Sequence, residues 1–507
     1  ATHNTAVGYS AGYAVTTGTA NTLIGGLAGD AQTTAANSTA VGYAALGANT
    51  TGSNNTAIGK EALDANTTGS ENVGVGVGAL GANTTAANNV AVGVNALGVN
   101  TTGTRNVALG AYTLDAHTTA NDNTGLGYAA LSSVTTGTAN TAVGAEALLS
   151  NTASNNTAVG NDALRANTTG AGNVAIGYTA LSANTTAANN TAVGFAALSV
   201  NTTGTQNIAI GTNALDANTT ASNNVAIGVN SLGVNTTGAA NTGLGHETLI
   251  ANTTGASNVA VGKNALRANT TAVNNTAVGY ASLTANTTGT ENVAVGAGAL
   301  DANTTASYNT ALGKDAMGAN TTGHSNTGIG RYALLTNTTG SYNVALGRDA
   351  LRVSTAANNT AVGFAALTVN TTGTTNVAVG AYALDANTTA SNNTAVGYSS
   401  LTANSTGTGL VAVGTNALDA NTTASNNVGI GLNAAGATTT GASNIAIGTN
   451  SLLQNTTGAL NVAVGTYALN ANTTAANNTA VGHSALTANT TGSDNTALGG
   501  SAGAAIT

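Results

Sequence analysis

Branched aliphatic residues recur along this chain at a fixed spacing, inside a five-residue phrase of Asn, Thr or Val, Ala or Gly, an aliphatic residue and Gly. The phrase occurs 30 times, ending first at Gly8 and last at Gly499. Of the 29 intervals, 27 span 17 residues and two, which begin at Gly144 and Gly347, span 16. A unit this short cannot bury a core alone, so neighbouring units must stack. The repeat predicts one continuous solenoid domain over residues 1–507.

The turn around Gly59 illustrates the elements that this pattern predicts. The β-branched run before Gly59 predicts a short strand, and the Gly supplies a bend that a Cβ atom would obstruct. A second extended piece is expected over residues 66–68. Two short strands in 17 residues fit one turn of a parallel β-solenoid, with turns about 4.8 Å apart and 30 of them forming a rod on the order of 140 Å long. The fold class is therefore all-β, and the bending residues include Gly59, Gly76, Gly93 and Gly110.

Two Asn positions are nearly constant from turn to turn. Asn stands four residues before the Gly in 28 of 30 copies and seven residues after it in 23 copies. The amide of one Asn can donate to and accept from an identical amide one turn away. The sequence thus predicts two Asn ladders. Their first members after Gly42 are Asn55, Asn72, Asn89 and Asn106 in one ladder, and Asn66, Asn83 and Asn100 in the other.

The alternation within the phrase predicts which side chains share a face. Residues three and one before the Gly lie on one face of a strand, and we expect them to form the core with the Leu four residues after the Gly. The predicted core is Ile58, Val75, Val92, Leu63, Leu80 and Leu97. The residue between them is Ala or Gly in 29 of 30 copies, so we expect this row to pack closely against another surface, with a second copy of the chain as a candidate partner. This candidate packing interface includes Ala57, Gly74, Ala91 and Ala108.

Composition narrows the function classes. Only 5% of residues are charged, and nine Lys and Arg residues spread over 30 turns form no basic stripe, which argues against nucleic-acid binding. No apolar run is long enough to span a membrane. Without Cys there are no disulfides. The chain begins without Met or a signal-peptide pattern, so we expect a processed form. The fibrous repeat and the Asn/Thr-rich surface favour an extracellular or surface-attached fibre.

Catalytic and metal-binding motifs do not stand out from the repeat. Residues 76–81 match G-x-G-x-x-G, but no long helix follows, so chance explains the match. His246 and Glu247 lack the second His of a zinc-protease helix, and the five His residues lie far apart along the chain. Residues many turns apart cannot converge in a solenoid. We therefore predict no enzyme activity and no catalytic, cofactor or metal site.

Three surface features leave binding functions open. Asn66-Thr67-Thr68 and its counterparts match the N-glycosylation sequon, but sugars on every turn would not fit within about 4.8 Å, which favours the ladder role and leaves occasional sugars open. Aromatic residues just after the Gly are candidate glycan contacts or surface decoration. Adjacent Thr residues in the sequon point opposite ways, which argues against an ice-binding array without excluding one. The candidate glycan contacts are Tyr43, Tyr128, Tyr178 and Phe195.

The phrase Asn-Thr-Ala-Val-Gly at 393–397, with Ile in place of Val at 55–59, resembles the Asn-Ser-Val-Ala-Ile-Gly phrase of YadA-like head repeats in trimeric autotransporter adhesins. It also resembles the Asn/Thr/Gly repeats of phage and algal-virus tail fibres. The resemblance implies a left-handed β-roll with Thr56 and Ile58 facing inwards. It further implies a homotrimer outside the cell.

The leading hypothesis is a structural fibre subunit. Gly12, Gly29 and Gly503 occupy the core Leu position in the first two turns and the last. We expect neither end to carry a helix or a charged cap. Uncovered strand edges pair with other chains, so we expect head-to-tail association into a filament. The alternatives are a trimeric adhesin or tail-fibre shaft that binds surface glycans, and an ice-binding protein.

Overall fold

The computed structural model describes residues 1–507 as two compact units, 1–256 and 257–507. Each turn of either unit contributes one strand, made of the three residues before the Gly. The strands of residues 1–256 are β1 (Thr5–Val7), β2 (Thr22–Ile24), β3 (Thr39–Val41), β4 (Thr56–Ile58), β5 (Val73–Val75), β6 (Val90–Val92), β7 (Val107–Leu109), β8 (Thr124–Leu126), β9 (Thr141–Val143), β10 (Thr157–Val159), β11 (Val174–Ile176), β12 (Thr191–Val193), β13 (Ile208–Ile210), β14 (Val225–Ile227) and β15 (Thr242–Leu244).

The second unit repeats this organisation, and neither unit contains a helix. The strands of residues 257–507 are β16 (Val259–Val261), β17 (Thr276–Val278), β18 (Val293–Val295), β19 (Thr310–Leu312), β20 (Thr327–Ile329), β21 (Val344–Leu346), β22 (Thr360–Val362), β23 (Val377–Val379), β24 (Thr394–Val396), β25 (Val411–Val413), β26 (Val428–Ile430), β27 (Ile445–Ile447), β28 (Val462–Val464), β29 (Thr479–Val481) and β30 (Thr496–Leu498).

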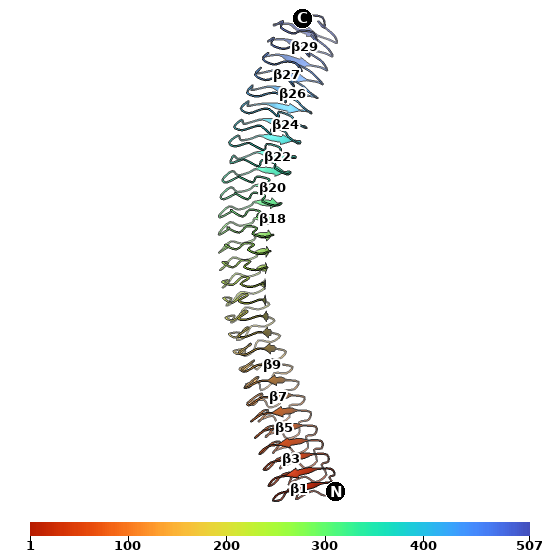
Figure 1. The fold of residues 1–507 in the computed structure, drawn as a ribbon, viewed down its shortest axis with the longest axis vertical. Coiled ribbons are helices and arrows are strands. Elements are labelled where there is room, and N and C mark those ends of the chain that lie inside the picture. Colours follow the sequence, from red (N-terminus) through yellow and green to blue (C-terminus); the bar gives the residue numbers. More distant parts are fainter. The chain divides into compact units, whose positions relative to one another are not determined.

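Consecutive strands within each unit pair in parallel and in register. In the pair β4 and β5, for example, Thr56 lies opposite Val73 and Ile58 opposite Val75. Figure 1 shows this stacking, with the strand of one turn lying next to the strand of the following turn within each unit. The two 16-residue intervals keep the register, since β9 pairs with β10 and β21 with β22 residue for residue. The predicted all-β parallel solenoid is confirmed within each unit.

The predicted second strand over 66–68 is wrong. The backbone N–H groups of Thr67 and Thr68 both donate to the carbonyl of Thr84, at 2.9 and 3.3 Å, so this corner is a bend without the alternating bonds of a strand ladder. The Thr67 hydroxyl donates to the same carbonyl at 3.1 Å. The corner is therefore held by a column of Thr hydroxyls and converging amides.

The strand faces the opposite way from the sequence prediction. Ala57 and Leu63 are fully buried, whereas Ile58 is 41% exposed. Val75 and Val92 are only partly buried, so these three aliphatic residues lie outside the core. The predicted core residues Leu63, Leu80 and Leu97 are fully buried, as expected. The small row faces inwards, which corrects its assignment as a packing interface between chains; its members include Ala57, Gly74, Ala91 and Ala108.

The narrow interior explains why the inward strand residue is small. A Cβ atom on Gly74 would lie 3.1 Å from the carbonyl oxygen of Ala79 and 3.4 Å from Cγ of Leu63. The exception, Leu23, is fully buried, and a Cβ on Gly12 or Gly29 would lie 2.8 Å from one of its methyl carbons. These glycines leave room for Leu23, so they compensate its size, as close packing of a protein interior requires.

Backbone conformation accounts for the constant Gly. Gly59 has φ of +132°, and a Cβ there would collide with the carbonyl oxygen of Gly76 in the next turn. This agrees with the predicted bend. Leu63 also has a positive φ, 52°, which costs a non-Gly residue roughly 1–2 kcal/mol. Full burial of its side chain contributes about 1.5–3 kcal/mol, enough to offset that cost.

Candidate interaction surface

The first Asn ladder joins side chains to backbone. The Asn72 backbone N–H donates to Oδ1 of Asn55 at 3.0 Å, and its own Nδ2 donates to the Ala86 carbonyl at 2.8 Å. The predicted ladder exists, but its links are mainly amide to backbone. A buried amide with all of these bonds made incurs little desolvation penalty. The fully buried members include Asn55, Asn72, Asn89 and Asn106.

The second ladder joins amide to amide, as the sequence predicts. Nδ2 of Asn83 donates to Oδ1 of Asn66 at 2.8 Å and to the Ala86 carbonyl at 3.1 Å. The Ala86 carbonyl therefore accepts from both ladders and ties them together inside one turn. Asn66, Asn83 and Asn100 are fully buried. The two ladders thus help to hold neighbouring turns in register, which gives the outer strand face a regular repeat.

That outer strand face carries two columns of partly exposed side chains. The residue one before the Gly is a branched aliphatic in every turn, and the residue three before it is Thr, Val or Ile. Val107 and Leu109, which flank one inward Ala, are 39% and 45% exposed. We call this surface the strand face. Its most exposed aliphatic members in residues 1–256 are Val7, Ile24, Ile58, Val90, Val107, Leu109, Leu126, Ile176, Ile208, Ile210 and Leu244.

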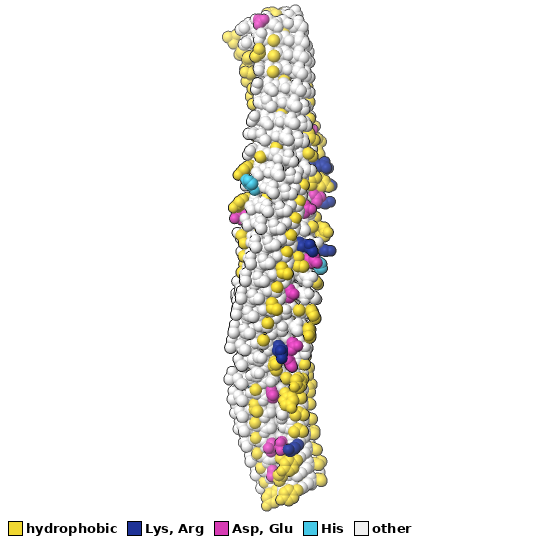
Figure 2. Space-filling view, turned by 90° about the vertical axis from the view of Figure 1, so that its left-hand side faces the viewer, with side chains coloured by type: hydrophobic (Ala, Val, Ile, Leu, Met, Phe, Trp, Pro, Cys, Tyr) yellow, Lys and Arg dark blue, Asp and Glu magenta, His cyan; other side chains and the backbone are white.

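The second unit carries the same strand face. Its most exposed aliphatic members in residues 257–507 are Val259, Val293, Leu312, Val344, Leu346, Val377, Val413, Ile430, Ile445, Ile447 and Leu498. Charge is absent from these positions in all 30 turns. Figure 2 shows apolar side chains in columns along the turns, with charged side chains in small separate groups. Contiguous exposed apolar surface of this kind marks an interaction site on a soluble protein.

The predicted aromatic contacts all lie on the surface. Tyr43, Tyr128, Tyr178 and Phe195 are 52–56% exposed. Tyr178 and Phe195, on consecutive turns, stack on each other with ring centroids 5.5 Å apart and planes 17° apart. Tyr128 meets Tyr112 edge to face at 6.1 Å. Glycan binding by these residues stays a prediction.

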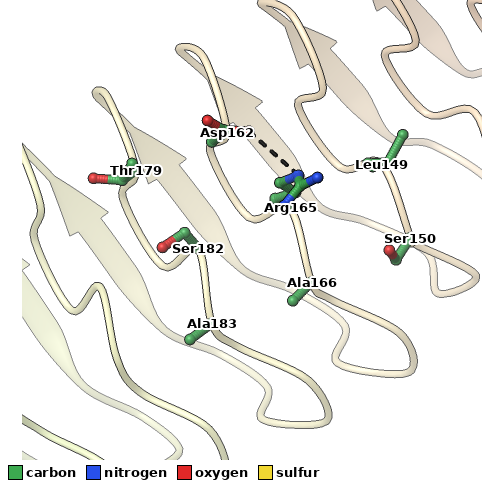
Figure 3. Close-up of a pocket in the computed structure, with 8 residues that line it drawn as sticks. All are labelled: Leu149, Ser150, Asp162, Arg165, Ala166, Thr179, Ser182 and Ala183. Atoms are coloured by element: carbon green, nitrogen blue, oxygen red, sulfur yellow. Dashed lines mark ion pairs between the residues drawn. The ribbon is translucent and has the colours of Figure 1, made fainter.

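A surface hollow of about 410 Å³ lies beside the first 16-residue interval, lined by Leu149, Ser150, Asp162, Arg165, Ala166, Thr179, Ser182 and Ala183. Arg165 lies among these residues and forms an ion pair with Asp162, as Figure 3 shows. Its Nε lies 2.7 Å from Oε2 of Glu146 and 3.3 Å from Oδ1 of Asp162. Two carboxylates thus flank the one cation.

His117 is a feature that the sequence prediction missed. It occupies the second-ladder position, is fully buried, and neither ring nitrogen has a hydrogen-bond partner. Burial lowers the pKa of His117 to about 4, since the charged ring cannot be solvated there. Burial likewise raises the pKa of several Asp carboxyls five residues after the Gly, namely Asp64, Asp216, Asp301, Asp385 and Asp419.

No group of three or more His, Asp or Glu side chains is arranged to hold a metal ion. None of the chain's elements is a helix with the length and hydrophobicity needed to cross a bilayer. No protein-family model matches the sequence, and no curated protein matches it. The strand face is the candidate functional site because its partly exposed apolar columns recur in both units.

Proposed function

We propose that this protein is a structural, non-enzymatic subunit of an extracellular fibre whose solenoids associate side by side through the strand face. The single observation that carries this proposal is the pair of partly exposed columns, one aliphatic in every turn, that repeat along both units. The occupant is a second copy of the chain, because a regular apolar column with a repeat of about 4.8 Å matches another column of the same repeat best. Head-to-tail pairing and the number of chains stay predictions.

The size of the strand face supports an interface between copies. Full burial of an aliphatic side chain removes roughly 100 Å² from water, so a side chain about 40% exposed can still bury roughly 40 Å². One or two such residues per turn over the 15 strands of a unit give roughly 600–1,200 Å² per partner. A stable interface needs about 800 Å² per partner. One unit alone therefore reaches that range.

Light scattering on a strand-face variant tests this proposal. Replacing Leu109, Leu126, Ile176 and Ile210 by Thr removes four outward aliphatic side chains and keeps residues that favour strands. The wild-type chain is expected to have a solution mass that is a multiple of 48.1 kDa, and the variant is expected to dissociate at least tenfold more readily.

The matched control replaces four exposed Thr residues at the opposite corner by Ser, namely Thr68, Thr102, Thr119 and Thr186. This control should keep the wild-type mass, and circular dichroism should show that both variants retain the β-solenoid. A wild-type chain of 48.1 kDa at every concentration would contradict the proposal.

A second function, ice binding, is favoured by one observation. In each turn the two outward residues of the strand face are separated by one inward residue, and the first of the two is Thr in 16 turns. Thr and aliphatic side chains therefore form a two-column array. The adjacent Thr residues of the corner lack that geometry. Thermal hysteresis in a solution of the chain would support ice binding if replacing Thr141 and Thr157 by Lys abolished it. A solution without thermal hysteresis would argue against ice binding and leave the fibre subunit as the proposed function.

A further inference from the structure

The chain contains two sets of N-x-Thr sequons that the structure places in opposite environments. The ladder set comprises 22 Asn residues seven after the Gly, each followed by Thr or Ser and then Thr. The corner set comprises eight Asn residues five before the Gly, just ahead of the strand: Asn37, Asn54, Asn155, Asn189, Asn274, Asn358, Asn392 and Asn477. No other position in the chain carries the pattern.

Ladder sequons are closed to modification in the folded chain. All 22 of their Asn residues are fully buried. Nδ2 of Asn66, the atom that would carry a sugar, instead donates to Oδ1 of Asn49 and to the Gly69 carbonyl, both at 2.9 Å. A sugar on this nitrogen would remove at least one of those bonds and require space that the close-packed interior lacks.

The sequons of the corner set are exposed to solvent. All eight Asn side chains are exposed, and none of them is held in a ladder. Asn189, for instance, has φ of 59°, so its Cβ projects from a left-handed bend ahead of β12, while its backbone N–H donates to the Ala171 carbonyl at 3.0 Å. The backbone is thereby fixed and the side chain left free. The sequon hydroxyl, on Thr191 two residues later, lies on the partly exposed strand face.

We propose that these eight corner Asn residues are acceptors for N-linked sugars, added to the chain after it folds. In the transfer, Nδ2 of Asn forms a bond to the anomeric carbon of a sugar diphosphate donor. The bond from that carbon to the phosphate oxygen breaks, the diphosphate leaves with the electron pair, and one amide proton passes to solvent. The modification does not depend on the fibre role, but the transfer has to precede side-by-side association, because the sequon hydroxyls lie on the strand face.

The spacing of the corner set leaves room for the sugars. Asn155 and Asn189 are two turns apart, as are Asn358 and Asn392, which corresponds to about 10 Å. Asn37 and Asn54 alone lie on consecutive turns. The left-handed φ at this position favours Asn, but that preference does not require Thr two residues later. Thr nevertheless follows in eight of the eleven turns with Asn here.

The test exposes the folded chain to a soluble N-glycosyltransferase that moves glucose from a nucleotide sugar to N-x-Ser/Thr, and maps hexoses by peptide mass spectrometry. We expect hexoses on the corner set and at least tenfold lower occupancy on ladder Asn residues. After unfolding in urea and dilution into the assay, the ladder sequons should become substrates too. A short synthetic peptide spanning 186–192 confirms that the enzyme accepts the sequon.

Matched controls come from the repeat itself. Three exposed Asn residues also stand five before the Gly but have Val two residues later, namely Asn88, Asn223 and Asn426. They lack the sequon, so they should stay unmodified. Thr191→Val should abolish the hexose on Asn189 alone, and Val90→Thr should create a new site on Asn88. Both substitutions should leave the fold intact, because Thr and Val each occupy this position in other turns of the chain.

Two results would overturn the proposal. One is a folded chain with no hexose on the corner set while the peptide is modified. The other is a folded chain whose ladder residues, such as Asn66, are modified as extensively as Asn189. The same assay on the variant with Leu109, Leu126, Ile176 and Ile210 replaced by Thr removes any effect of association, so this proposal and the fibre proposal can fail separately.

Discussion

Two stretches of the second Asn ladder in residues 1–256 differ sharply. From Asn66 to Asn100 each amide donates to the previous one, at 2.8–3.0 Å. The next two turns place His117 and then Val134 at the ladder position, and His117 has no hydrogen-bond partner on either ring nitrogen. The ladder resumes at Asn151, whose Oδ1 accepts from Asn167 at 2.7 Å. One ladder is thus continuous in the first stretch and interrupted in the second.

The first ladder crosses that interruption unbroken. The Asn123 backbone N–H donates to Oδ1 of Asn106 at 3.0 Å, and Nδ2 of Asn123 donates to the Gly137 carbonyl at 2.9 Å. Strands β7, β8 and β9 also remain paired. The comparison teaches that the two ladders are partly redundant, so a turn can lose one amide column and keep its register.

Breaking the intact stretch should have the largest effect. Asn83→Leu leaves Oδ1 of Asn66 buried without a donor and adds bulk to a filled interior, at a combined cost of about 4 kcal/mol. Because a solenoid turn contacts only its neighbours, the loss should be local. Hydrogen exchange should show faster opening of the turns around Asn83. The control is Thr85→Ser, in the exposed bend that follows Asn83, which should leave the exchange unchanged. Unchanged protection would argue that the ladder adds no stability.

The second largest effect should be a loss of stability in the interrupted stretch when the pH is lowered. The folded pKa of His117 is about 4, below its ordinary value of about 6.5, so the unfolded state binds more protons between these values. The free energy of unfolding of this stretch should therefore be unaffected by His117 above pH 6.5. It should fall by roughly 3 kcal/mol as the pH is lowered to about 4. Hydrogen exchange of residues 110–134, corrected for intrinsic rates, measures this loss. An opening free energy that does not change with pH in these residues would refute the prediction.

Repairing the ladder should have a smaller effect of opposite sign. His117→Asn supplies an amide that can donate to Oδ1 of Asn100 and to the Ala120 carbonyl, which should stabilise this stretch by about 1–2 kcal/mol at pH 7. The variant should also lose the acid sensitivity between pH 6.5 and 4. If His117→Asn left the acid sensitivity in place, another group would be responsible for it.

Restoring a 17-residue turn should change stability least. The first short interval lacks one corner Thr, yet Nδ2 of Asn151 still donates to the Ala153 carbonyl at 2.8 Å. Inserting Thr after Thr152 lengthens an exposed corner only, so we expect a change below about 0.5 kcal/mol in the midpoint of chemical unfolding. A loss of several kcal/mol would show that the shorter corner has a structural role of its own.

Much of the fold could be predicted from the sequence because a strict register leaves few alternatives. The repeat length, the bending Gly and both Asn ladders depend on spacing alone. The direction of the strand did not follow, because a period of two shows which side chains share a face and not which face is inside. Leu23 carried the missing signal: the one large residue in the small row lies between Gly12 and Gly29, which is the compensation expected inside a core.

The surface properties were harder to predict for a physical reason. The partly exposed aliphatic columns became visible only when the strand direction was known, and the sequons of the corner set could be told from the ladder set only by burial. The isolation of buried His117 likewise depends on its neighbours in space. Composition and spacing do not contain that information.

The most direct test of side-by-side association is cryo-electron microscopy of the purified chain at a resolution that shows strands in cross-section. The proposed fibre subunit predicts particles with two or more solenoids whose strand faces, including Ile58 and Leu109, meet in the middle. Single solenoids with the strand face in contact with solvent, or assemblies joined through any other surface, would contradict it.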